Sequence, residues 1–229
     1  MASLTESAMS LPGFRVNPAP QLAPASVVKA LEHVVAPQLS DNLARSIGIA
    51  GLTRYNRAGK LIGTAFTAKC RPGDNLVLYK ALTMLQPGHV LVTDGGGESN
   101  NALVGELIKL HAQKLGCVGF VIDGAILDVA SFEDFPCYAR SVIHRGPYKD
   151  GPGELNVPVS VGGQVINPGD IVVGDEDGVV NFAQADADEL IAVAAKRNTK
   201  EQAIQAEIAT GRCEQEWINQ ILVAKGLAE

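Results

Sequence analysis

The sequence predicts one α/β domain with mixed sheets and flanking helices, behind a short N-terminal arm. Two apolar runs that end in aspartate, residues 90–94 and 120–123, are joined by a helix-length segment from about residue 100 to about residue 115. A strand, a helix and a strand in this order form a right-handed crossover, which sets two parallel strands side by side. The later part of the chain has short strand-like runs and then helical spacing. Together these observations predict the mixed architecture.

The predicted arm covers residues 1–24, and the predicted single domain covers residues 25–229. Four prolines stand among small polar residues in the arm, at positions 12, 18, 20 and 24. Such a segment is ordered only where it packs on a neighbour. The domain begins with apolar residues at helical spacing between residues 27 and 47, which predict one or two amphipathic helices.

A strand is predicted over residues 61–70, which alternate and carry β-branched side chains before the turn at Pro72. Residues 76–85 predict a helix that leads into the crossover. After the crossover, glycine-rich turns separate short strand-like runs around residues 158–161, 165–166, 171–173 and 179–182. The tail predicts two helices, over residues 185–210 and 214–227, that are broken at Gly211.

The bulk composition narrows the class of protein. A length of 229 residues and a hydrophobic content of 46% predict a chain that folds around a real core. The net charge of −6 and the absence of a Lys/Arg-rich segment argue against nucleic-acid binding. The four cysteines, Cys70, Cys117, Cys137 and Cys213, lack metal-ligand spacing, and the first residues lack a signal-peptide pattern. We therefore expect a reduced, cytoplasmic protein without structural zinc, disulfides or a membrane segment.

A glycine run, Gly95, Gly96 and Gly97, precedes the predicted crossover helix and permits two interpretations. It is either a plain tight turn or a loop whose backbone N–H groups bind an anionic oxygen, such as a carboxylate or an enolate of a substrate. A dinucleotide-binding fingerprint is disfavoured, because the spacing is not GxGxxG and Asp123 falls at the wrong distance.

Three acidic residues around the crossover are candidate ligands of Mg²⁺ or Mn²⁺: Glu106, Asp123 and Asp128. These cations take one or two carboxylates together with waters and substrate oxygens. A solvated surface position is the alternative for each of them, because the chain has 25 acidic residues. The serines have no GxSxG context, so a serine hydrolase is disfavoured.

Several segments, taken in order, resemble one family. The chain is similar to the RraA-like family, which includes the class II 4-hydroxy-4-methyl-2-oxoglutarate/4-carboxy-4-hydroxy-2-oxoadipate aldolases. The likeness runs from about residue 41 to about residue 211. The segments that carry it lie at residues 63–67, 72–75, 87–96, 105–107, 119–125, 158–163 and 168–179.

The resemblance implies a swivelling β/β/α domain that assembles as a homo-oligomer, a trimer or a hexamer, with each site between subunits. It implies a lyase of the aldolase type that acts on a 2-keto acid, by retro-aldol cleavage or decarboxylation that releases pyruvate. In that scheme Asp128 holds the Mg²⁺ or Mn²⁺, and Glu106 holds waters near the metal and assists proton transfer. The Leu107 amide faces the substrate oxygens, and Glu201 is a candidate for a glutamate that an adjacent subunit contributes.

One position departs from the family pattern. The aldolases have Arg-Asp where this chain has Leu127-Asp128, after Glu106 and twenty intervening residues. Leucine cannot donate the bidentate hydrogen bonds that arginine gives to the keto acid and the enolate. Three downstream cations are candidate replacements, and the sequence does not choose among them: Arg140, Arg145 and Lys149.

The second interpretation is a non-catalytic protein of the same family. The family member that inhibits a ribonuclease keeps the arginine and lacks the metal-binding aspartate, which is the reverse of the pattern at Leu127 and Asp128. The sequence therefore favours a metal-dependent enzyme. The alternative is a regulator that binds a ribonuclease or a helicase, or an inactive paralogue.

Overall fold

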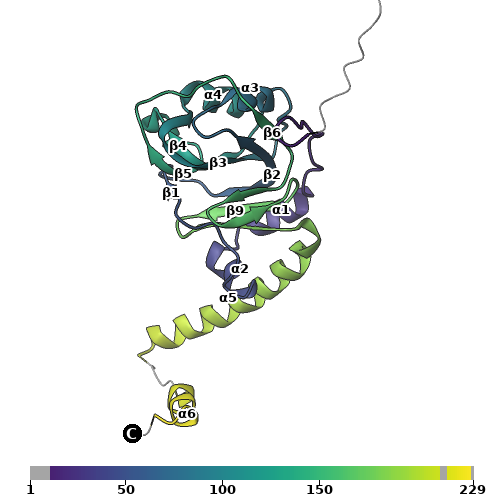
Figure 1. The fold of residues 1–229 in the computed structure, drawn as a ribbon. Helices are drawn as coiled ribbons and strands as arrows, with labels where there is room; N and C mark the ends of the chain where they lie inside the picture. Colours follow the sequence, from purple (N-terminus) through teal and green to yellow (C-terminus); the bar gives the residue numbers. More distant parts are fainter. Residues whose placement is uncertain (1–10, 212–215, 228–229) are drawn as a thin grey trace, which may run out of the picture.

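The computed structural model describes residues 11–211 and 216–227, and it has a mixed α/β fold (Figure 1). Its helices are α1 (Ala25–Leu31), α2 (Ala36–Asn42), α3 (Leu76–Leu82), α4 (Glu106–Lys114), α5 (Ala187–Ala209) and α6 (Glu216–Ala224), with short 3₁₀ turns at Val129–Phe132 and Gln184–Asp186. Its strands are β1 (Thr53–Arg54), β2 (Leu61–Cys70), β3 (His89–Val104), β4 (Gly119–Ile126), β5 (Cys137–Val142), β6 (Gly153–Leu155), β7 (Val159–Val161), β8 (Gln164–Ile166), β9 (Ile171–Asp175) and β10 (Gly178–Phe182).

An eight-stranded mixed sheet organises the domain. The order along the sheet is β1-β5-β4-β3-β2-β9-β10, and β6 pairs with β2. The central strands β2, β3, β4 and β5 are parallel neighbours, whereas β1, β6, β9 and β10 pair antiparallel. The parallel β3–α4–β4 unit is the crossover that the sequence predicts. It brings the carboxyl ends of β3 and β4 to the same edge of the sheet, where ligands tend to bind.

Apolar residues fill both faces of the sheet, because neighbouring residues of a strand point to opposite faces. Phe120 and Ile122 pack under α3 and α4 on one face, while Val121 packs under the β7–β8 hairpin on the other. A third cluster joins α1, α2 and α5 to β9 and β10. Figure 1 shows α3 and α4 at the top of the drawn domain, and α2 and α5 at the other end, below β9.

The predicted mixed sheet with flanking helices is confirmed, and β2 matches the predicted strand over residues 61–70. The crossover differs in detail from the prediction. β3 continues past Asp94 to Val104, so residues 100–104 are strand and α4 begins only at Glu106. β4 likewise continues past Asp123 to Ile126. Apolar residues follow the glycines in both strands, at positions 102–104 of β3 and 125–126 of β4, and they continue each strand.

The glycine run lies in an irregular part of β3 and does not lead directly into the helix. Residues 94 and 104 of β3 pair with residues 123 and 126 of β4, and the register shifts three times between them. The surplus residues of β3 must therefore bulge out of the ladder. Gly96 and Gly97 have φ values of +67° and +70°, a conformation that a residue with a Cβ rarely adopts.

The described part of the N-terminal arm, residues 11–24, packs on the same chain. Val16 forms a bridge with Leu155 of β6, and Arg15 Nε donates to Glu154 Oε1 at 2.5 Å. Asn17 and Asn156 exchange side-chain to backbone hydrogen bonds. Residues 11–24 therefore pack against other parts of the same chain. The remainder of the predicted arm, residues 1–10, lies outside the described residues.

The predicted tail helices are present as α5 and α6, although the bounds differ by a few residues. Buried residues of α5 are confined to its first part, at Ala187, Leu190 and Ala194, and the rest of the helix extends away from the sheet (Figure 1). Among the described helices none is long and apolar enough to cross a membrane. Cys70, Cys117 and Cys137 are buried free thiols, and burial raises the pKa of each. Cys213 lies outside the described residues.

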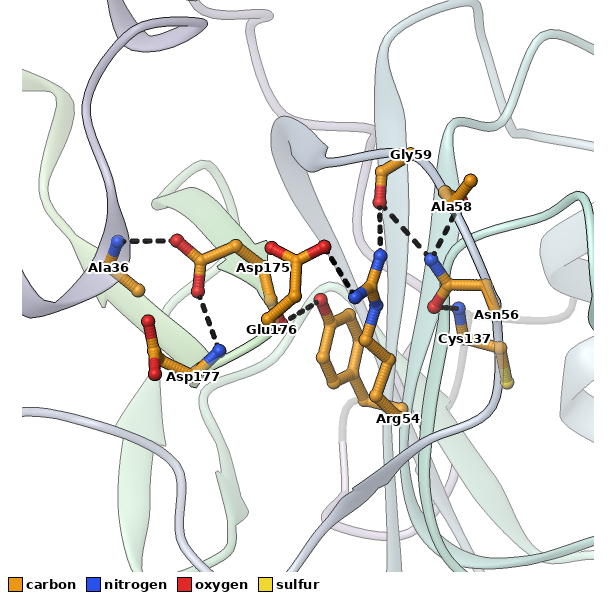
Figure 2. Close-up of polar contacts among 10 residues, drawn as sticks. Ala36, Arg54, Asn56, Ala58, Gly59, Cys137, Asp175, Glu176 and Asp177 are labelled. Atoms are coloured by element: carbon orange, nitrogen blue, oxygen red, sulfur yellow. Dashed lines mark hydrogen bonds and ion pairs between the residues drawn. The ribbon is translucent and has the colours of Figure 1, made fainter.

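A dense polar cluster connects β1 and β9 to α2 (Figure 2). Asp175 at the end of β9 accepts from Ala36 N at 2.7 Å and from Asp177 N at 3.0 Å. Arg54 donates to Glu176 at 2.7 Å and to the Gly59 carbonyl at 3.0 Å. The cluster therefore holds the loops around β1 and β9 together.

Candidate active site

Asp128 lies just beyond the carboxyl end of β4, next to the first turn of α4. Its backbone has φ 54° and ψ 42°, a left-handed conformation that is uncommon for residues other than glycine. Its Oδ2 accepts a hydrogen bond from Glu106 N, the first amide of α4, at 3.2 Å. Oδ1 has no donor among the described residues. Sparsely populated backbone conformations of this kind occur often at functional sites, where the surrounding structure holds them.

Gly105 allows the carboxylate of Asp128 to approach the helix. A Cβ at position 105 would lie 2.8 Å from Asp128 Oδ2 and 2.9 Å from Leu127 Cγ, closer than real Cβ contacts come. The φ of Gly105 is −145°, which any residue adopts, so space and not backbone strain requires glycine. The sequence Gly105-Glu106 therefore positions Asp128 through a close contact.

Two cavities meet at Leu127 and Asp128. The larger has a volume of about 730 Å³ and is lined by Glu106, Leu127, Asp128, Val129, Ala130, Ser131, Val142, Ile143 and His144. The smaller has a volume of about 110 Å³ and is lined by Asn75, Tyr79, Leu103, Gly105, Leu107, Ile108, Leu127, Asp128, Pro147 and Lys149. Asp128 is exposed and Leu127 is half-buried, so the carboxylate reaches solvent while the leucine forms part of the wall.

The structure brings together four of the residues singled out from the sequence: Glu106, Leu107, Leu127 and Asp128. The other candidates lie elsewhere. Gly95, Gly96 and Gly97 line neither cavity, and a Cβ on them would contact Leu103, Pro72 and Arg140 respectively. Asp123 is buried and bonded to Arg140 and to Gly162 N. Glu201 bonds to Gln38 and Arg197 on the side of α2 and α5.

Comparison with known protein families identifies the family of this chain. Residues 36–181 match the family described as RraA-like, Aldolase/RraA. The chain belongs to the RraA-like family. Helices α5 and α6 follow the matched region, so most of the C-terminal helical tail is an addition to the part that defines the family.

Two relatives and one solved structure illustrate the likeness to other RraA-like proteins. A protein of Halalkalibacterium halodurans named "Putative 4-hydroxy-4-methyl-2-oxoglutarate aldolase" is 35% identical over 168 residues, which cover 71% of this chain and 80% of that protein. A protein of the same name from Ectopseudomonas mendocina is 32% identical, covering 67% and 96% of the two chains. The structure of Streptomyces coelicolor RraAS2, described as an unusual member of the RNase ES inhibitor RraA protein family, matches with a TM-score of 0.73 and 25% identity, covering 81% and 99%.

Three cationic residues are candidate replacements for the arginine that this chain lacks at position 127. One of them is already ion-paired, and a second lines neither cavity. Arg140 forms a bidentate ion pair with Asp123, and this hydrogen bond raises the pKa of Arg140. Arg145 lines neither cavity, although its carbonyl accepts from Ala102 N at 2.9 Å. Lys149 lines the smaller cavity together with Leu127 and Asp128.

The carboxylate of Asp128 fits a divalent cation such as Mg²⁺. Within the described ranges, no group of three His, Cys, Asp or Glu side chains is arranged to hold a metal. Mg²⁺ does not need such a group, because it keeps several waters and is bound by one or two carboxylates plus substrate oxygens. Asp128 Oδ1 is free to be one such ligand, and Glu106 stands beside it on the wall of the larger cavity.

The structure adds His144, which follows β5, to the residues around the larger cavity, although no motif in the sequence marks it as a site residue. β5 runs parallel to β4, with Ile126 opposite Val142, so His144 comes after β5 much as Asp128 comes after β4. The strand escaped prediction because its residues, 137–142, mix apolar and polar side chains without clear alternation. The signal that was available is the rule that neighbouring parallel strands deliver their following loops to one edge.

Proposed function

We propose that this protein is a divalent-metal-dependent lyase that cleaves a 2-keto acid by retro-aldol reaction or decarboxylation and releases pyruvate. The observation that carries the proposal is the carboxylate of Asp128, held beside the first amide of α4 at the junction of two cavities. The names of the two aldolase relatives support it, since both are more than 30% identical to this chain.

Asp128 and Glu106 would have different roles in the proposed reaction. Asp128 would hold Mg²⁺ or Mn²⁺ through Oδ1, while its Oδ2 stays bonded to Glu106 N. When bound, such a cation acts as a Lewis acid that stabilises negative charge on a carbonyl oxygen. The exposed side chain of Glu106 would hold a water that takes the proton of the C4 hydroxyl. The C3–C4 bond then breaks, its electron pair moves to the C2 carbonyl, and the enolate takes a proton at C3 to give pyruvate.

The site is open on one side, which supports the expectation that a second copy of the chain covers it. Leu107, which lines the smaller cavity, is 77% exposed, and Leu110, on the same helix, is 48% exposed. We propose a trimer or hexamer with composite sites, in which Glu201 of another copy approaches Asp128. Light scattering tests this proposal, because a mass near the 24.0 kDa of one chain would contradict a composite site.

Pyruvate release tests the proposed activity. Purified protein is given oxaloacetate or a 4-hydroxy-2-keto acid with Mg²⁺, and pyruvate is followed through coupling to lactate dehydrogenase. We expect turnover that EDTA abolishes and that added Mg²⁺ or Mn²⁺ restores. Absence of turnover together with tight binding to a ribonuclease or helicase would instead support the regulatory alternative, which the likeness to RraAS2 keeps in view.

A further inference from the structure

One exposed lysine, Lys149, lines the small cavity beside Asp128. Lys149 Nζ lies 5.7 Å from the centroid of the Tyr79 ring and forms no ion pair within the described residues. No other lysine or arginine of the described chain lines either of the two cavities. A cation on the wall of a cavity raises the local concentration of anions and so favours an anionic ligand.

The backbone on both sides of Lys149 is held firmly. The buried carboxylate of Asp74 accepts from Asp150 N at 2.7 Å and from Gly151 N at 2.9 Å. On the other side, Tyr148 N donates to the Gly73 carbonyl at 2.9 Å. The Cα of Lys149 is therefore fixed relative to the start of α3, while its four-carbon stem can still adjust to a ligand.

One residue of the same cavity has a buried hydrogen-bond acceptor that receives no hydrogen bond. Asn75 is 2% exposed, and its Nδ2 donates to the Leu103 carbonyl at 2.9 Å. Its Oδ1 has no hydrogen-bond partner among the described residues, although buried polar atoms are nearly always paired. Asn75 thus forms part of the wall of the smaller cavity, where the only charged side chains are those of Asp128 and Lys149.

From these contacts we infer that Lys149 binds a carboxylate of the substrate, in the role that the family's arginine has in the position of Leu127. The inference rests on the proposed function, because it assigns this residue to the substrate of that reaction. The cavity of about 110 Å³ takes a compact charged end of the keto acid, and the cavity of about 730 Å³ takes the remainder on the other side of Asp128. Lys149 is thus a specificity-determining residue for acids that carry a carboxylate at this end.

Three variants test the inference, with oxalate as the probe and Mg²⁺ present. Lys149→Met removes the charge and keeps the stem, and Lys149→Arg keeps the charge. The matched control is Lys80→Met, since Lys80 is also exposed, on α3, and lines a different groove with Phe14 and Pro152. Calorimetry measures the affinity for oxalate, steady-state kinetics measures KM and kcat for oxaloacetate, and thermal unfolding confirms that each variant is folded.

The expected result is a split among the variants. Lys149→Met weakens oxalate binding and raises the KM for oxaloacetate about tenfold or more, the effect of one lost charge-assisted hydrogen bond. Lys149→Arg keeps most of the affinity, and Lys80→Met changes nothing. Unchanged oxalate affinity in folded Lys149→Met, or no binding of oxalate by the wild type, overturns the inference. Failure of the proposed function has a different signature, which is oxalate binding that depends on Lys149 without any release of pyruvate.

Discussion

Asp128 and Asp175 make the same local contact in two different environments. Each carboxylate accepts a hydrogen bond from the first amide of a helix, Glu106 N of α4 for Asp128 and Ala36 N of α2 for Asp175. Asp175 is 4% exposed, and its second oxygen also accepts a backbone amide, from Asp177 (Figure 2). Asp128 is exposed, and its second oxygen has no donor in the described chain.

The difference shows how a site can be distinguished from a structural cluster. Around Asp175, most neighbouring polar groups also have partners, although Arg54 Nε has none. Tyr138 donates to the Asp175 carbonyl at 2.8 Å, and Asn56 bonds to three backbone groups (Figure 2). Around Asp128, Asn75 and Lys149 keep unused hydrogen-bonding capacity. Groups that are saturated stabilise the fold, whereas groups that are left open can bind a ligand.

The largest effect is expected from removing the negative charge of Asp128. Asp128→Asn keeps the side-chain shape and the acceptor for Glu106 N, and asparagine tolerates the left-handed backbone. It removes the negative charge that holds the cation. We expect calorimetry to detect no Mg²⁺ binding and kcat/KM to fall roughly a thousandfold, the scale of several kcal/mol of lost charge stabilisation.

The control for Asp128→Asn is Glu133→Gln, which removes an exposed carboxylate just outside the cavities. It should bind Mg²⁺ as the wild type does. If Asp128→Asn retained normal Mg²⁺ affinity, the assignment of Asp128 as the metal ligand would be wrong.

Disrupting the polar cluster around Asp175 should instead lower the stability of the fold. Asp175→Ala leaves the amides of Ala36 and Asp177 without acceptors in a buried place, which should lower the free energy of unfolding by about 2–4 kcal/mol. Urea unfolding measures this loss. The exposed neighbour Asp177→Ala should change stability by less than about 0.5 kcal/mol. A fall in Mg²⁺ affinity of folded Asp175→Ala as large as that of Asp128→Asn would contradict the separation of the two regions.

A smaller effect is expected from restoring the family's arginine. Leu127 is half-buried between two cavities, so an arginine in its place has room to extend beside Asp128. Leu127→Arg should raise kcat/KM for pyruvate formation about tenfold, because the added hydrogen bonds strengthen as the enolate forms. It should also rescue part of the loss in Lys149→Met. A folded, metal-binding Leu127→Arg protein without any gain would show that the pocket has diverged further than this one residue.

The smallest expected effect concerns pH. Burial alone raises the pKa of Asp74, but hydrogen bonds from the amides of Leu76, Asp150 and Gly151 outweigh it and lower the pKa below the usual 3.8. A carboxyl with a lowered folded-state pKa contributes stability that is present above pH 3.8 and is lost as pH falls through the folded value. Urea unfolding at a series of pH values should show this loss below about pH 4, and the loss should be smaller in Asp74→Asn. The exposed neighbour Asp150→Asn should follow the wild type.

Much of the frame could be predicted from the sequence. β2 was predictable because alternation over residues 61–70 and the Pro-Gly turn after it are local signals. The β3–α4–β4 crossover followed from the same kind of signal, and the approach of Glu106 to Asp128 followed from the family pattern. The bulge in β3 and the strand β5 were missed, since irregular pairing depends on the partner strand and not on local periodicity.

By itself, the sequence determined the strand β2, the parallel crossover, the two tail helices and the candidate pair Glu106 and Asp128. Only the tertiary structure decided which downstream cation lines a cavity together with Asp128. Arg140 is drawn to Asp123 across neighbouring strands, whereas Lys149 is carried to the small cavity by the bonds of Asp74. The physical reason is that strand and turn preferences act over a few residues, whereas an ion pair or a cavity wall forms between segments that only the folded chain brings together.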